Sequence, residues 1–411
     1  MQKLFYNGDI LTVESPGPAE AVLAEGGRII AVGDLRSLSR MVGRQSEWID
    51  LEGGALLAGF ADCHSNFWAV VRAHAAAHSG GHIGMRAIRA AVRSAAEAYA
   101  ARGFTVLHAR GLTDEGLRAL SHSDLPMPLW ATVPLEEYET VKRTMASLRA
   151  PIYLRGISLD LDLRDDGGVA TGETAYCDRA LSFALRMAAA ERVRPVMRAE
   201  SEATAAQFLR VMRAVSRCCP DLTALRPILA DARLLPPTVL ERVRELGIVP
   251  CFAVDVLPRL GDDWMAACGM EQTARLAPLA SARRAGLPYT LCEGLSGEED
   301  VPDPIGMLTA AVERKTERGV VIGSEERTSV RDALRALTAN VAWSCGAERE
   351  WGGIRAGMRA DLIRLDRSPL SLPTKELREL RVVETFVGGE SFWHEEGHNF
   401  STHASRVPIV Y

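Results

Sequence analysis

Two polar side chains at alternate positions follow a short apolar run and are the first candidates for chemistry. Residues 59–66 read Gly-Phe-Ala-Asp-Cys-His-Ser-Asn and come directly after the apolar residues 55–58. Alternate side chains of a strand share one face, so His64 and Asn66 are expected to point the same way. A histidine at position 66 would complete a pair of imidazole ligands for a divalent metal, whereas an asparagine amide is a poor ligand for zinc-class ions. The stretch therefore indicates a metal-type site that has lost a ligand.

Two stretches of the chain resemble the amidohydrolase superfamily. Residues 59–66 are similar to the Gly-Phe-x-Asp-x-His-x-His pattern that closes the first barrel strand there, and residues 353–366 resemble its Gly-x-Ile-x-x-Gly-x-x-Ala-Asp-Leu-x-x-Leu-Asp return strand. The branch that is most similar is the YtcJ-like group, amidohydrolase family 3, which residues 325–328, 333–338 and 366–370 also resemble. The resemblance runs in order along nearly the whole chain, so it implies the fold, while the activity is a separate question.

The order of the expected elements favours a parallel α/β core between two β-rich ends. Short alternating strands with turn residues between them occupy the first 57 residues and return after residue 359, and we expect the two ends to pair into one small β-sandwich. Strands and helices alternate between these ends, which predicts a (β/α)8 barrel with its site at the carboxyl ends of the strands. The eight expected strands are 55–60, 104–108, 127–133, 152–160, 193–198, 226–231, 248–254 and 288–293. The expected division is 1–57 and 351–394 for the sandwich, 58–350 for the barrel and 395–411 for an extended tail.

Several strand ends differ from what the resemblance implies. Arg198 stands where the related pattern has a ligand histidine, Asp231 replaces a second histidine, and Glu293 replaces the catalytic aspartate. The position that holds lysine in the related pattern is Ser158 here. The chain has only four lysines, and none lies at the end of an expected barrel strand, so a metal pair bridged by a carbamylated lysine is not expected.

The residues that replace the expected metal ligands could balance one another's charge. Removing a dication from a cluster of acids leaves unbalanced negative charge, and buried unpaired charge is costly. Arg198 supplies a permanent cation with five donors, which suits charge-assisted pairs with Asp231 and Glu293. We therefore predict that Arg198 takes the electrostatic role of the metal and that the site holds no metal and no other cofactor. The alternative is an ion-pair network with a purely structural role.

These strand ends give the expected site. The predicted catalytic residues are His64, Arg198, Asp231 and Glu293. The predicted substrate-binding residues are Asp62, Asn66, His108, Asp160, Asp162, Glu200 and Cys292. Structural roles stay open for the two histidines, and solvated loop positions stay open for Asp160 and Asp162. The thiols of Cys63 and Cys292 are either nucleophiles or buried core groups.

Two further histidine patterns are weaker candidates. Residues 394–398 fit His-Glu-x-x-His, but that motif needs a helix, and here it follows an expected strand and contains Gly397. His74, His78 and His82 are spaced four apart, but Gly80 and Gly81 interrupt the helix that would align them. Neither pattern is expected to bind a metal.

Composition narrows the possible partners. The chain has 411 residues, 47% hydrophobic and 25% charged, which is ordinary for a globular protein. Its net charge of −5 without a basic stripe argues against nucleic acid, and no apolar run approaches the roughly 20 residues of a membrane span. The amino terminus lacks the apolar core of a signal peptide, and the eight scattered cysteines suit a reduced, cytoplasmic protein. We expect a small-molecule substrate and a homodimer.

Three functions stay open. The favoured interpretation is a metal-independent enzyme of specialised metabolism that uses acid/base chemistry. Without a metal to generate hydroxide, lyase, cyclase or isomerase chemistry gains weight over hydrolysis of a C–N bond. The second interpretation is a metal-dependent hydrolase with an unusual His/Asn/Asp/Glu site. The third is a catalytically inactive scaffold that binds a ligand.

Overall fold

The computed structural model describes residues 1–13, 19–79, 84–148, 151–165, 170–295, 297, 299–396 and 402–404. The chain divides into two compact units, which are described separately. The terminal unit contains residues 1–61, 96–106 and 330–411, and the central unit contains residues 62–95 and 107–329. The boundaries expected at residues 57, 350 and 394 stay a prediction.

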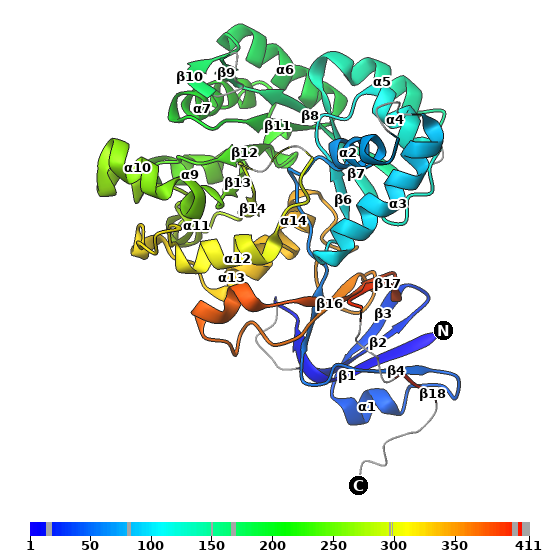
Figure 1. Cartoon of the computed structure of the whole chain (residues 1–411). Helices are drawn as coiled ribbons and strands as arrows, with labels where there is room; N and C mark the ends of the chain where they lie inside the picture. The colour runs from blue at the N-terminus through cyan, green and yellow to red at the C-terminus, as the bar shows by residue number, and fades with distance from the viewer. Residues whose placement is uncertain are drawn as a thin grey trace. The chain divides into compact units, whose positions relative to one another are not determined.

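The central unit is built on a parallel sheet of seven strands (Figure 1). The strand order is β14-β13-β12-β11-β8-β7-β6, and each neighbouring pair is parallel. The strands are β6 (Leu107–Ala109), β7 (Leu129–Pro134), β8 (Ile152–Asp160), β11 (Arg194–Arg198), β12 (Ile228–Ala232), β13 (Val249–Ala253) and β14 (Thr290–Cys292). Every residue of β12 and of β13 is buried, as expected for parallel strands that are covered on both faces.

Helices lie before, between and after these strands, as the sequence pattern predicts. Their local signals are clear: Ser201 caps the helix at residues 202–216 by accepting from the Thr204 amide, and a proline at position 237 begins the helix that ends at residue 245. The helices are α2 (Phe67–Ser79), α3 (Met85–Ala101), α4 (Asp114–Ser121), η1 (Leu135–Glu137), α5 (Tyr138–Met145), α6 (Asp178–Glu191), α7 (Glu202–Ser216), α8 (Asp221–Ala224), α9 (Pro237–Glu245), α10 (Val256–Thr273), α11 (Leu279–Arg284), α12 (Pro304–Glu313) and η2 (Ser324–Glu326). A short hairpin, β9 (Asp162–Arg164) and β10 (Ala170–Thr174), follows β8.

The terminal unit joins both ends of the chain in one nine-stranded sheet. Its main order is β17-β16-β15-β5-β1-β2-β3, and β4 pairs with both β1 and β18. The strands are β1 (Gln2–Leu11), β2 (Ala19–Glu25), β3 (Arg28–Gly33), β4 (Glu47–Asp50), β5 (Ala55–Ala58), β15 (Leu362–Leu365), β16 (Val382–Val387), β17 (Glu390–His394) and β18 (Thr402–Ala404). Its helices are α1 (Leu35–Ser39), α13 (Val330–Ala336), α14 (Ala339–Ser344) and η3 (Thr374–Glu379). The expected pairing of the two chain ends is confirmed, since β15 lies antiparallel to β5.

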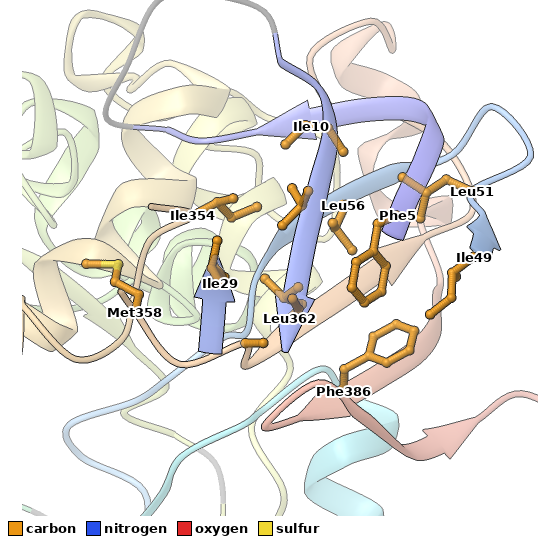
Figure 2. Packing of buried hydrophobic residues seen from close by; sticks show 13 residues of the cluster. Phe5, Ile10, Ile29, Ile49, Leu51, Leu56, Ile354, Met358, Leu362 and Phe386 are labelled. Atoms are coloured by element: carbon orange, nitrogen blue, oxygen red, sulfur yellow. The ribbon is translucent and has the colours of Figure 1, made fainter. Parts of the chain in front are cut away.

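Buried side chains from both ends of the chain pack together in the terminal unit (Figure 2). Phe5 of β1 meets Phe386 of β16 edge to face, with ring centroids 5.0 Å apart. Leu56, Leu362 and Ile354 belong to the same cluster. Residues more than 300 positions apart in sequence therefore share one core, to which both ends of the chain contribute.

The first expected barrel strand differs from the other seven. Residues 55–58 form β5, whose two edges pair with β1 and β15 of the terminal sheet. A strand has only two hydrogen-bonding edges, so this stretch has no edge left for a ladder with the central strands. The chain continues to Phe60, which makes a single parallel bridge to Phe104. Strands two to eight appear in the expected order and type.

Candidate active site

A pocket lies at the carboxyl ends of the central strands, where a barrel of this kind carries its site. The pocket spans about 410 Å³, including the solvent at its mouth. Residues that follow β6, end β11 and follow β14 contribute to its wall. The lining residues are Asp62, His64, Ser65, Asn66, Arg110, Arg198, Glu293, Gly294, Gly297, Asp300 and Pro302. Five residues of the expected site thus share one pocket: Asp62, His64, Asn66, Arg198 and Glu293.

Arg198, the last residue of β11, is held by three carboxylates. Its guanidinium lies 3.2 Å from Asp160 Oδ2, 2.8 Å from Glu200 Oε1 and 3.0 Å from Asp231 Oδ2. Burial lowers the pKa of Arg198, but the negative charges of Asp231, Glu200 and Asp160 outweigh burial and raise it. The guanidinium therefore stays charged and fixed in the pocket wall.

Two more arginines extend this network, and neither lies at an expected strand end. Arg164 Nε lies 2.9 Å from Asp160 Oδ2, and Arg164 also pairs with Glu200. Arg233 lies 2.9 Å from Glu200 Oε2 and 3.4 Å from Asp231 Oδ1. Three cations thus alternate with three anions, so that each acid contacts two guanidinium groups or more.

Glu293 is placed differently from the expectation that it pairs with Arg198. It lies in the same pocket, and its Oε1 accepts a hydrogen bond of 3.1 Å from the amide of Asp303. The ion pairs of Arg198 among the described residues go to Asp160, Glu200 and Asp231. The expected pair with Asp231 is therefore present, and the position expected for Glu293 is taken by Glu200 and Asp160.

The backbone at Asp231 is strained, and a glycine in a neighbouring segment of the same chain leaves room for its side chain. Asp231 has φ of 56°, in the left-handed region that aspartate tolerates better than most residues, and its side chain is fully buried. Burial raises the pKa of Asp231, while Arg233 and Arg198 act to lower it. A Cβ at position 294 would lie 2.1 Å from Asp231 Oδ1, so Gly294 is required for this close approach.

His64 faces a second guanidinium in the pocket. Arg110 Nη1 lies 2.9 Å from His64 Nε2. Because a guanidinium only donates, Nε2 must accept and the ring proton must sit on Nδ1. Burial, followed by the charge of Arg110, lowers the pKa of His64 well below its usual range. His64 is therefore a neutral imidazole.

Arg110 is the main residue that sequence reasoning missed. It lies two residues beyond His108, just after β6, where the expected site contained only the histidine. The Nδ1 atom of His108 lies 3.0 Å from the Ser65 carbonyl oxygen, and burial lowers the pKa of His108 to about 4. A search that included charged residues two positions past each strand would have found Arg110.

Burial brings the pKa of Asp62, another lining residue, close to neutral pH. Burial raises its pKa to about 7, against the backbone amide of His64, which donates to Asp62 Oδ1 at 2.6 Å. The charge of Glu293 adds to the rise, and that of Arg110 opposes it. A carboxyl group with such a pKa suits proton transfer at pH 7.

The other expected site residues lie around the pocket. Asp162 is buried and accepts from the amides of Glu200 and Ser201 at 2.7 and 3.3 Å, so it fixes the loop after β11. Asn66 Oδ1 accepts from the Ala69 amide at the start of α2. Cys292 is fully buried, and burial raises its pKa to about 12, which keeps it a thiol. Cys63 Sγ lies 3.5 Å from Cys251 Sγ inside the same core.

The weaker histidine patterns receive no support as metal sites in the described part of the chain. His394 ends β17, and His398 lies outside the described residues. His74 Nδ1 lies 3.0 Å from Ser94 Oγ, while the side chain of His78 and all of His82 lie outside the described residues. Among the described residues, no three histidine, cysteine, aspartate or glutamate side chains are grouped to hold a metal ion.

A comparison with known families shows the family to which the chain belongs. The model of the amidohydrolase family matches residues 72–392. The chain belongs to the amidohydrolase family. The expected YtcJ-like relationship, family 3, is thereby confirmed. No helix in the described part of this amidohydrolase is long and apolar enough to span a membrane.

Solved structures with the same fold cover nearly the whole amidohydrolase chain. An uncharacterized metal-dependent hydrolase from Pyrococcus furiosus has a TM-score of 0.73 at 16% identity, over 90% of this chain and all of that one. An adenosine deaminase from Xanthomonas campestris with bound zinc has a TM-score of 0.67 at 15% identity, over 95% and 92% of the two chains. A triazine hydrolase variant has a TM-score of 0.67 at 17% identity, over 95% and 94%. These matches confirm the expected barrel-type fold.

One curated relative is similar over a shorter stretch. An N-substituted formamide deformylase from Arthrobacter pascens is 36% identical over 123 residues. That stretch is 29% of this chain and 22% of the deformylase, so the chain matches about a fifth of that protein. The reaction of this amidohydrolase therefore has to be argued from its own side chains.

The side chains of the pocket do not fit a divalent metal ion. A metal-dependent hydrolase has the same fold, yet His64 Nε2 here faces a guanidinium donor at 2.9 Å. The carboxylates that could act as oxygen ligands, Asp160, Glu200 and Asp231, are shared among three arginines. A cation placed among those guanidinium groups would meet like charge, which opposes binding.

Proposed function

We propose that this amidohydrolase acts on a small polar molecule by side-chain acid/base chemistry, with arginines supplying the positive charge that a metal supplies in related enzymes. The observation that carries the proposal is the position of Arg198, which lines the pocket and lies within 3.2 Å of the carboxylates of Asp160, Glu200 and Asp231. A guanidinium fixed in this way is preorganised to stabilise negative charge that develops on a substrate.

Asp62 is the best placed group to transfer the proton. It lines the pocket, and its pKa of about 7 allows it both to accept and to return a proton near neutral pH. His64 suits this role less because its Nε2 is engaged by Arg110 and its pKa lies far below 7. Glu293, in the same pocket, is the second acid/base candidate, while Asp231 holds Arg198 and Arg233.

The reaction that these groups support is cleavage or rearrangement at a carbon–nitrogen bond. For hydrolysis, Asp62 accepts a proton from water as the water oxygen attacks the carbon, and it returns that proton to the departing nitrogen. Arg110 and Arg198 stabilise the oxyanion between the two steps. The similarity to an N-substituted formamide deformylase supports C–N chemistry, and the same proton transfers also serve a lyase, cyclase or isomerase reaction.

The proposal is tested by metal analysis together with turnover. The purified protein is assayed for bound transition metals by mass spectrometry and for turnover of a panel of N-substituted formamides and amides. We expect less than one tenth of an equivalent of metal, turnover that a chelator leaves unchanged, and at least a hundredfold loss in Arg198→Ala. Stoichiometric metal with activity lost to the chelator would establish a metal-dependent hydrolase instead. Ligand binding without turnover of any compound would establish a scaffold.

A matched arginine variant controls for the loss of charge. Arg210 is exposed and makes a surface ion pair of 2.8 Å with Asp178. Arg210→Ala removes the same side chain outside the pocket and is expected to keep full turnover. A homodimer in the cytoplasm stays a prediction, and light scattering of the purified protein tests its dimeric state.

A further inference from the structure

Asn66 lines the pocket, and the two polar ends of its side chain have different surroundings. Its Oδ1 accepts a hydrogen bond of 3.2 Å from the amide of Ala69, which caps the amino end of α2. A backbone amide only donates, so the atom that it faces is the side-chain oxygen, and the NH2 group points the other way. The cap thus sets the direction of the two N–H donors of Asn66.

The NH2 group of Asn66 is open to a ligand. Among the described residues it has no hydrogen-bond partner, and it is not one of the polar atoms there that are sealed from solvent without a partner. Asn66 as a whole is partly exposed, in contrast to its buried neighbour Ser65. Because Asn66 lines the pocket, a molecule held there can accept from its Nδ2.

The backbone that carries Asn66 is held against the segment after β6. Asn66 forms a β-bridge with Ala109, and the amide of Arg110 donates to the carbonyl oxygen of Ser65 at 3.1 Å. A third contact joins the guanidinium of Arg110 to His64 Nε2 at 2.9 Å. A donor on such a rigid support is preorganised, because little has to be ordered when a ligand binds.

The donors of Asn66 differ in kind from those of Arg110 and Arg198, which line the same pocket. A guanidinium carries a full charge, whereas the NH2 group of an amide is neutral and suits an uncharged carbonyl oxygen. A hydrogen bond to that oxygen strengthens as negative charge develops on it, which favours the transition state over the bound substrate. An imidazole at position 66 could bind a metal, whereas the amide that stands there can bind the substrate oxygen.

We infer that Asn66 donates from Nδ2 to the carbonyl oxygen of the substrate, which is an uncharged acyl compound of nitrogen, an amide or a formamide. This inference rests on the proposed function, because it takes the pocket as the active site. Asn66 and the arginines then share the oxygen on which negative charge develops while the C–N bond reacts. A compound without a carbonyl oxygen leaves the Asn66 donors unpaired inside the complex, so the pocket discriminates against it.

Nuclear magnetic resonance of the whole chain tests the inference without any assay of turnover. The chain has four asparagines, Asn7, Asn66, Asn340 and Asn399, so selective labelling of asparagine with nitrogen-15 gives four side-chain NH2 signals. The signal that is absent from Asn66→Ser belongs to Asn66. Asn7 is an internal control because its Nδ2 already donates to Asp50 Oδ1 at 2.7 Å, in the terminal unit.

Three probes of similar size are compared by their effect on the Asn66 signal. N-methylformamide has a carbonyl oxygen, ethylmethylammonium has no acceptor, and formate has a charged carboxylate. We expect N-methylformamide to shift the Asn66 NH2 protons downfield until the site is saturated, while the Asn7 signal stays in place. No shift with N-methylformamide, an equal shift with ethylmethylammonium, or saturation by formate at a lower concentration would overturn the inference.

Two variants separate the donor of Asn66 from its helix cap. Asn66→Asp and Asn66→Ser both keep an oxygen that can accept from the Ala69 amide, and both remove the NH2 group. We expect each to unfold near the wild-type temperature and to lose about 10²–10³-fold in kcat for a formamide that the wild type turns over. Asp34→Ser is the matched control, because Asp34 caps α1 of the terminal unit by accepting from the Ser37 amide at 2.8 Å. It should keep full turnover.

The outcomes of these variants are distinct. An unchanged kcat in Asn66→Ser would overturn the inference, and a loss in Asn66→Asp alone would come from its new charge and would overturn it too. If both variants fail to fold, the effect of N-methylformamide on the four wild-type signals decides, since a shift of none of them would overturn the inference. Metal dependence of turnover would refute the proposed function while leaving the resonance results intact.

Discussion

Two arginines of the central unit, Arg314 and Arg198, are largely or fully buried but are bound in opposite ways. Arg314 is fully buried at the end of α12, and its guanidinium donates to four backbone carbonyls. These belong to Ile322, Ala277, Leu276 and Ala274, at 2.8, 2.8, 2.6 and 3.4 Å. Arg198 has a side chain that is 21% exposed, and it contacts three carboxylates beside the pocket.

The difference separates a structural role from a functional one. Carbonyl groups carry no net charge, and burial lowers the pKa of Arg314 to about 10. The buried charge is therefore costly, and the hydrogen bonds that link Arg314 to the backbone of several loops offset this cost. Arg198 is compensated by acids, keeps one face toward the pocket, and shares its acids with Arg164 and Arg233. A buried guanidinium therefore marks a site only when its partners are charged and a pocket lies beside it.

The largest effect on stability is expected from Arg314→Ala. Removing the guanidinium leaves several carbonyls without a donor, and each such buried group costs about 1–3 kcal/mol, so the free energy of unfolding should fall by more than about 3 kcal/mol. Urea unfolding followed by circular dichroism measures it. Arg318→Ala removes an exposed arginine four residues on and should change little. Equal losses in the two variants would contradict a structural role for Arg314.

The next largest effect is expected in the pH dependence of the free energy of unfolding, to which Asp62 contributes. Its pKa is about 7 in the folded protein and about 4 in an unfolded chain, so between these values the folded state binds more protons. The free energy of unfolding should therefore fall as the pH rises from 4 to 7 and then level off. Asp62→Asn cannot titrate, so the difference in stability between wild type and variant should show this slope. A difference that rises with pH would mean that the carboxyl group is stabilised as an anion.

The fold follows closely from local patterns in the sequence. Residues 152–160 were expected as a strand and form β8 with those limits. Such elements are predictable because an apolar run or a helical period ends at residues with clear turn or capping preferences. Residues 55–58 were misassigned to the central strands because periodicity does not reveal which partner occupies a strand edge.

The candidate site was predictable in part. Arg198 and Asp231 follow from their positions at strand ends, because those ends converge in a parallel α/β fold. Arg110 and Arg233 each lie two positions past an expected strand end and were missed because only the strand ends themselves were considered. Arg164 was missed because its role depends on how far a long side chain reaches, which spacing along the chain does not determine. Charge balance was the correct guide to a guanidinium among acids, but it could not identify which acids or how many arginines share them.

A smaller effect on stability is expected where the backbone approaches the network. Gly294→Ala places a methyl group 2.1 Å from Asp231 Oδ1 and 2.8 Å from Ala253 Cβ, so one side must move. Overpacking of this kind costs about 1–3 kcal/mol, and turnover should fall further because Asp231 holds Arg198. Gly84→Ala is the control, since its Cβ would meet nothing within 4 Å. Thermal unfolding and turnover of both variants check the prediction, and an unperturbed Gly294→Ala would refute the tight approach.

The smallest effect on stability is expected from Arg198→Ala, although its effect on turnover is large. Each carboxylate that loses Arg198 still has another guanidinium as a partner. Asp160 pairs with Arg164 at 2.9 Å, and Asp231 pairs with Arg233 at 3.4 Å. Glu200 pairs with both Arg164 and Arg233. The loss in unfolding free energy should therefore be about 1 kcal/mol, below the roughly 3–5 kcal/mol that a buried charge left unpaired costs.

Urea unfolding of Arg198→Ala, Arg233→Ala and the double variant measures how far the two arginines share their acids. The double variant should lose more than the sum of the single variants, because Asp231 then keeps neither of its two arginines. If the losses in unfolding free energy simply add, the two arginines act independently of each other. The difference between Arg198 and Arg314 would then be explained by their burial alone.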